Sequence, residues 1–163
     1  MTPKLRTLIL IFLIASVIFS TAFILVNSLM DYEHSHSSSG VVTDIITSTE
    51  DEKEWASIEL IVRKFAHVIE YALLGACVTA FVLFIYRVFN KFLFGYSIAY
   101  SLFIAVLDEH FQSFSDRVSS TSDILLDFLG SIIGSSLVLI IFFVTIHLVR
   151  KNKKHKQKNA QSS

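Results

Sequence analysis

The chain has 163 residues, of which 53% are hydrophobic, with a mean hydropathy of +0.60 and a formal net charge of zero. This composition is too apolar for a soluble domain of this length and indicates an integral membrane protein. The single cysteine, Cys77, cannot form an internal disulfide, so cysteine usage does not indicate a redox compartment.

The first apolar run, Leu8–Val26, contains no charged residue and follows Lys4 and Arg6. A cleaved signal peptide is the competing interpretation, but its apolar region is about 7–15 residues long, whereas a full span needs about 20. The run therefore predicts an uncleaved transmembrane helix within residues 1–30. Because this helix lacks charge, we expect it at the periphery of the protein.

A polar segment, residues 31–58, follows and is expected to form an outer loop. Its Ser-rich part holds His34 and His36, which are more often solvated in such a context than bound to a metal. Thr49 and Glu52 have the spacing of a capping box. A helix beginning there would place Trp55 at the membrane interface and run into the next apolar segment.

Three further spans are expected at Val68–Val88, Phe92–Leu107 and Ile124–Val149, with a tight turn bracketed by Arg87 and Lys91. The third is short and rich in aromatic residues. Together with the first span, these segments predict an all-α integral membrane four-helix bundle.

The last span carries two features that bear on packing and topology. Gly130 and Gly134 are four residues apart, which lets a neighbouring helix approach closely. The tail, residues 150–163, is basic and is expected to be disordered. A basic tail at a cytoplasmic membrane face requires no nucleic acid partner.

The distribution of charge predicts the orientation in the cell membrane. Most Lys and Arg residues lie before the first span, between the second and third spans, and after the fourth span, which are segments on one side of the membrane. All 14 acidic residues lie in segments on the opposite side. Both termini are therefore predicted to be cytoplasmic. The cations on the cytoplasmic side are Lys4, Arg6, Arg87, Lys91, Arg150, Lys151, Lys153, Lys154, Lys156 and Lys158.

The stretch Arg63–Tyr71 opens the second span and carries ionisable groups at membrane depth. Lys64, His67 and Tyr71 share one helical face, and Glu70 lies on its flank. Ionisable groups in a membrane are energetically expensive and usually face protein or a water-filled cavity. In an alternative interpretation, Arg63 and Lys64 simply extend their side chains to the membrane interface. This interpretation would not explain why His67 and Glu70 lie in the same stretch.

The predicted topology brings polar residues of three spans to the same outer depth. Asp108 and Gln112 are four residues apart, as are Asp123 and Asp127, so each pair presents one helical face. We expect one polar cavity that opens at the outer face. The candidate catalytic residues are Lys64, His67, Glu70, Asp108, Glu109, Gln112, Arg117, Asp123 and Asp127.

Four blocks of these residues resemble the signature of the VanZ-like family. The blocks are Arg63–Tyr71, Asp108–Gln112, Arg117, and Asp123 with Asp127 and Gly130. The resemblance covers about half of the chain, within residues 59–149, and leaves out the first span and the outer loop. Where the family often has Pro-Gly before the loop arginine, this chain has Ser-Asp. The resemblance implies a bacterial envelope protein, because the founding member is associated with teicoplanin resistance, but it supplies no reaction.

The first functional hypothesis is an enzyme acting at the outer leaflet on a cell-wall precursor or lipid-linked substrate. His67 with Glu70 would form a general acid/base pair. Lys64 and Arg117 would hold an anionic group of the substrate, for which arginine offers two parallel donors. No activated Ser or Cys nucleophile is evident, which favours hydrolysis by water or group transfer.

Three functions other than an enzyme are also compatible with the sequence. A non-enzymatic protein would bind a glycopeptide or precursor in the same cavity, a small carrier would move a substrate, and a structural network would only neutralise charge. We expect no cofactor, with a divalent cation as the alternative, because Asp, Glu and His are adequate ligands. The His-Glu-x-x-His zinc motif is absent from the sequence.

Overall fold

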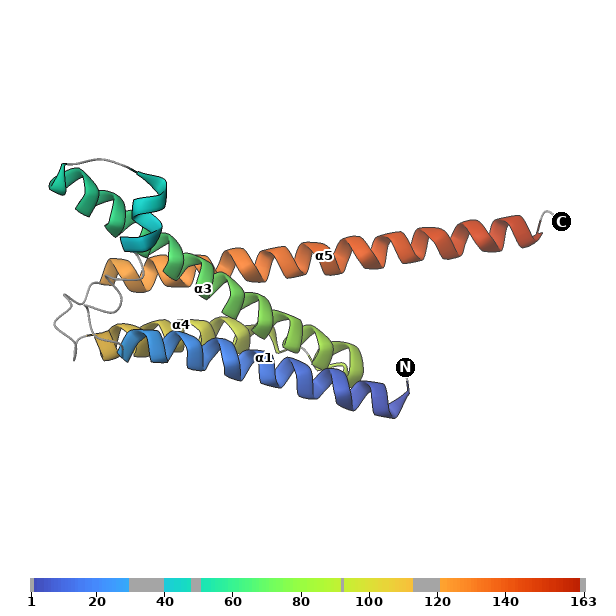
Figure 1. Ribbon diagram of the computed structural model, residues 1–163. Coiled ribbons are helices and arrows are strands. Elements are labelled where there is room, and N and C mark those ends of the chain that lie inside the picture. The colour runs from blue at the N-terminus through green and yellow to red at the C-terminus, as the bar shows by residue number, and fades with distance from the viewer. Residues whose placement is uncertain (1, 30–39, 48–50, 92, 113–120, 162–163) are drawn as a thin grey trace.

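The computed structural model describes residues 2–29, 40–47, 51–91, 93–112 and 121–161, and these ranges contain helices and no strand. The predicted all-α class is confirmed. The long helices are α1 (Pro3–Leu29), α3 (Glu52–Phe89), α4 (Phe94–Gln112) and α5 (Thr121–Gln161), and residues 40–46 form a short helical stretch before α3 (Figure 1).

Within the described residues, α1, α3 and the Thr121–Lys153 part of α5 are long and apolar enough to cross a membrane. These three candidate spans coincide with three of the expected ones. α4 has 19 residues and is therefore about 28 Å long, close to the thickness of the hydrocarbon core. Its Tyr, Ser and acidic residues lower its hydropathy, so a crossing by α4 stays a prediction.

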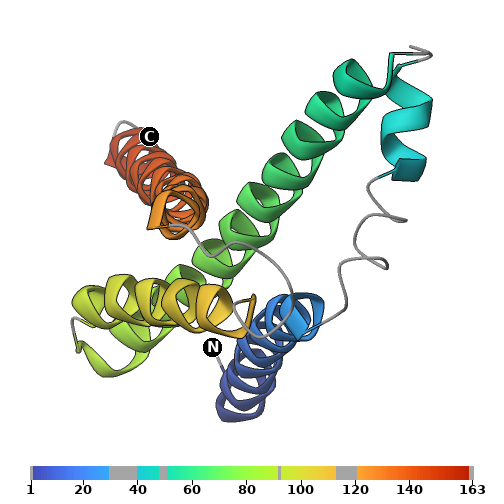
Figure 2. The same ribbon diagram turned by 90° about the vertical axis from the view of Figure 1, so that its left-hand side faces the viewer.

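α3 is the central helix and contacts α1, α4 and α5, with its most extensive interface on α5. The two ends of the chain lie toward the same side of the molecule, opposite the end where α4 stops and α5 begins (Figure 1). Figure 2 shows that latter end, with α3 passing between α5 and the α1–α4 pair. The second half of α5 extends past the other helices.

The close approach expected at Gly130 and Gly134 is confirmed, and α3 is the helix that makes it. A Cβ atom added at Gly130 would lie 2.5 Å from the carbonyl oxygen of Val68, and one at Gly134 would collide with the carbonyl of Ala72. Gly75 contributes from the α3 side in the same way. Backbone contact of this kind requires glycine because any side chain would separate the helices.

The start of α3 differs from the expected capping box. The N-cap is Asp51, whose carboxylate accepts a hydrogen bond from the backbone N–H of Lys53 at 2.9 Å. Thr49 lies outside the described residues. Because the helix begins at Glu52, the expected boundary at residues 58/59 falls inside α3 rather than between a loop and a helix.

The C-terminal ends of α3 and α5 test two further predictions, of which one is confirmed and one is wrong. The turn expected near residue 90 is confirmed, since Asn90 adopts a left-handed conformation with φ of 54° and ends α3. The expectation of a disordered tail is wrong, because α5 continues to Gln161. Extending an existing helix needs no new nucleus, and the Lys- and Gln-rich tail consists largely of good helix formers.

Candidate functional site

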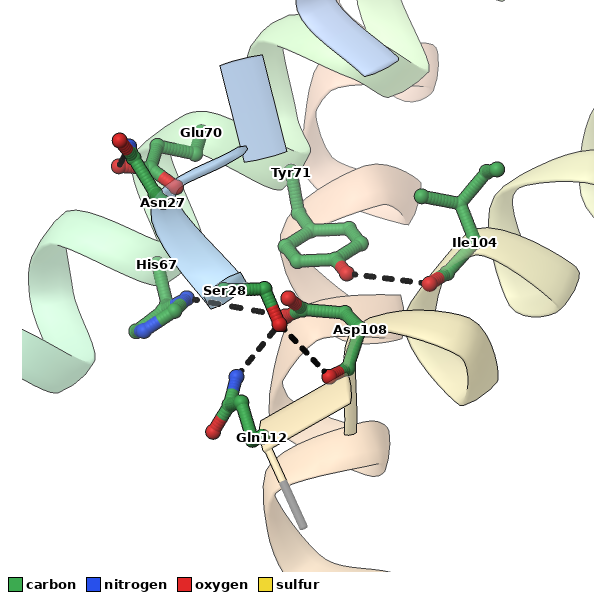
Figure 3. Close-up of polar contacts among 8 residues, drawn as sticks. All are labelled: Asn27, Ser28, His67, Glu70, Tyr71, Ile104, Asp108 and Gln112. Carbon is green, nitrogen blue, oxygen red and sulfur yellow. Dashed lines mark hydrogen bonds and ion pairs between the residues drawn. The ribbon is translucent and has the colours of Figure 1, made fainter. Parts of the chain in front are cut away.

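One buried cluster joins three helices at the end of the molecule where α4 stops. His67 of α3, Asp108 of α4 and Asp127 of α5 each contribute an atom, and these atoms lie within 4.8 Å of one another. The side chain of Asp108 is fully buried, and Asp127 is 3% exposed. His67 Nδ1 lies 4.0 Å from Asp108 Oδ2 (Figure 3). Segments far apart in the sequence thus form a single polar centre.

Asp108 is held from two sides. Gln112 Nε2 donates to Asp108 Oδ2 at 3.1 Å, and the Ser28 hydroxyl donates to the Asp108 backbone carbonyl at 2.9 Å (Figure 3). Its other oxygen, Oδ1, is buried and accepts no hydrogen bond from the described residues. These contacts therefore fix the position of Asp108 at the end of α4.

Glu70 lies on the α1 side of the cluster. Asn27 Nδ2 donates to Glu70 Oε1 at 3.2 Å, while Oε2 is buried and has no hydrogen-bond donor among the described residues (Figure 3). The imidazole of His67 faces Asp108 in the same view. Asp108 thus faces the histidine, a pairing that the sequence did not predict, whereas Glu70 accepts a hydrogen bond from Asn27.

Of the other candidate residues, Lys64 and Asp123 lie at the rim, Glu109 is buried near the end of α4, and Arg117 lies outside the described residues. Lys64 Nζ and Asp123 Oδ1 form an ion pair at 3.0 Å, with side chains 44% and 34% exposed. Glu109 is 3% exposed and precedes the last turn of α4. Arg117, with the Ser-Asp pair before it, lies outside the described residues, as do the loop histidines His34 and His36.

α1 contributes two residues that the sequence did not indicate, Asn27 and Ser28. The expectation that this helix lies at the periphery is wrong, because α1 packs against α3 and α4 and reaches both Glu70 and Asp108. The sequence signal for them was a pair of polar residues directly after the uncharged run Leu8–Val26. Tyr71, which shares the predicted face, is fully buried, and its hydroxyl lies 3.5 Å from the carbonyl oxygen of Ile104 (Figure 3).

An apolar groove of about 460 Å³ lies deeper along the same helices that carry Asn27, Glu70 and Asp108. Its lining includes residues of α1, α3 and α4, whereas the polar cluster sits nearer the end of α4. The lining residues include Val17, Val78, Val82, Tyr96, Tyr100 and Phe103. The polar cluster and the apolar groove therefore both lie along α3 and α4.

These features define an all-helical membrane protein with a buried His–Asp–Asp centre at one end. The sequence matches the VanZ/LLP1 family over residues 8–144, and the chain belongs to this family. The predicted family is confirmed, but the match begins in α1 and includes the polar segment at residues 31–58, which the resemblance leaves out. No curated protein and no solved structure gives a significant match.

Proposed function

We propose that this VanZ/LLP1 protein acts at the outer leaflet of a bacterial cell membrane on a lipid-linked envelope substrate, by acid/base chemistry. The outward orientation rests on the distribution of cations along the chain. The chemistry rests on the buried ionisable groups of α3, α4 and α5, because such groups are expensive in a membrane and usually serve a function.

The observation that carries the substrate class is the groove below the polar cluster. Along α4, Phe103 lies about 7.5 Å and Tyr96 about 18 Å from Asp108, at roughly 1.5 Å per residue. A polar head group at the cluster would thus leave a hydrocarbon chain at the depth of the groove. The apolar and aromatic lining would accommodate such a chain.

Within this proposal His67 is the proton acceptor and donor, and Asp108 orients its imidazole. Gln112 and Ser28 hold Asp108 in position. The substrate of the reaction would be attacked by a water molecule or a second acceptor group, since the proposal assigns no nucleophilic side chain.

The test is a comparison of lipids and cell-wall precursors in cells with and without the protein. His67→Gln should abolish the difference at normal protein abundance, because glutamine keeps the size and polarity of the side chain but cannot shuttle a proton. Narrowing the groove by Ala99→Trp should reduce the difference for long-chain substrates, since Ala99 lines it. Identical profiles with and without the protein would contradict an enzymatic role.

Glu70 provides a second, independent test. Glu70→Gln keeps an oxygen that can accept the hydrogen bond from Asn27, so abundance and melting temperature should stay close to wild type. If Glu70 transfers protons, this variant should lose activity, while Glu70→Asp retains part of it. Full activity of Glu70→Gln would remove Glu70 from the mechanism and favour a binding protein, for which glycopeptide susceptibility of intact cells is the appropriate measurement.

A further inference from the structure

We propose that His67, Asp108 and Asp127 form a binding site for one divalent transition-metal cation, such as Zn²⁺ or Mn²⁺. The three side chains come from three different helices and offer one nitrogen and two oxygen atoms. The binding itself does not depend on a substrate, but an ion held by His67 and Asp108 would replace the proton-transfer and orienting roles that the proposed function gives to these two residues.

The distances suit a site that closes slightly around an ion. The three candidate ligand atoms lie within 4.8 Å of one another. In the tetrahedral geometry of zinc sites, ligands about 2.0–2.2 Å from the metal lie roughly 3.4 Å apart, so the side chains would have to move toward one another by on the order of 1 Å to coordinate together. His67 is the most exposed of the three and has the most room to adjust.

The charge of a divalent ion matches that of the two carboxylates in the cluster. Two carboxylates, Asp108 and Asp127, are 0% and 3% exposed, and burying unneutralised charge is costly. Lys64 is engaged with Asp123 at the rim. A protonated His67 would neutralise only one of the two carboxylates, whereas a divalent cation would neutralise both.

The buried oxygen of Asp108 is an independent indication of a ligand. Oδ1 accepts no hydrogen bond from the described residues, although Gln112 holds Oδ2 of the same carboxylate. Side chains that bind a metal are typically oriented by such second hydrogen bonds while another atom stays available. The Ser28 contact to the Asp108 backbone further restricts its position.

The ligand set selects the class of metal. One imidazole with two carboxylates suits Zn²⁺ or Mn²⁺, whereas Ca²⁺ and Mg²⁺ prefer oxygen ligands alone. Three protein ligands leave a coordination position for water, as in catalytic zinc sites.

The experiment uses the full chain, purified in detergent, stripped with a chelator and titrated with ZnCl₂, MnCl₂ or MgCl₂. Elemental analysis should find one Zn²⁺ or Mn²⁺ per chain, and the melting temperature should rise with either ion and fall again after chelation. Asp127→Asn should weaken binding by about 100-fold or more, because it removes a ligand rather than a supporting residue. His67→Gln is the second ligand variant, in case Asp127→Asn fails to fold.

Asp123→Asn is the matched control, because Asp123 lies one turn before Asp127 on α5 but pairs with Lys64 at the rim. It should bind the metal as wild type does. Absence of stoichiometric metal in the wild type, or equal binding by all variants, would overturn the proposal. Metal binding without any change in the lipid or precursor profile would retain the site and refute the proposed reaction.

Discussion

Replacing Gly134 by alanine tests whether backbone contact between α3 and α5 assembles the protein. The added Cβ would collide with the carbonyl oxygen of Ala72, which is fixed in the hydrogen-bond ladder of α3. Restoring an ordinary contact requires the helices to separate by on the order of 1 Å. A gap of this size forfeits about a quarter to a half of the dispersion energy of the affected contacts.

The net effect of Gly134→Ala follows from two opposing contributions. Overpacking costs about 1–3 kcal/mol, and the clash with a backbone atom places this site at or above the upper end. The higher helix propensity of alanine returns at most about 1 kcal/mol. We therefore expect a destabilisation of about 2 kcal/mol, measured as a lower melting temperature in detergent, together with weaker metal binding because Asp127 is carried on the displaced helix.

The matched control is Gly95→Ala on α4, where an added Cβ meets nothing within 4 Å. This variant should melt at or slightly above the wild-type temperature, because only the propensity contribution remains. If Gly134→Ala melts as high as Gly95→Ala, the close α3–α5 contact does not stabilise the fold and the reasoning is refuted.

Two further predictions concern the rim and the orientation in the membrane. Lys64→Gln and Asp123→Asn should each lower stability by less than about 1 kcal/mol in thermal unfolding, because the ion pair is partly exposed to solvent; a larger loss would mean that the pair is buried in the membrane-embedded protein. In a Cys77→Ala background, an impermeant thiol reagent added to intact cells should label a cysteine at Asp44 and spare one at Arg87, and labelling of position 87 would contradict the topology.

Much of the architecture was predictable because it depends on local properties of the chain. Hydropathy located the helices, and the spacing of His67 and Glu70 on one helix predicted that both face a polar environment, since side-chain direction on a helix follows from sequence separation. The contact at Gly130 and Gly134 was predictable for the same reason. The catalytic role of the polar residues is not tested by the fold and stays a prediction.

Only the tertiary structure decided which side chains from different helices meet. The sequence places Asp108, Asp123 and Asp127 at similar depth, yet depth does not reveal that Asp127 faces His67 while Asp123 reaches Lys64. That choice depends on the rotation of each helix about its axis and on lateral spacing. Both are determined by long-range packing, in which glycines bring α3 against α5 and α1 inserts its polar end beside α4.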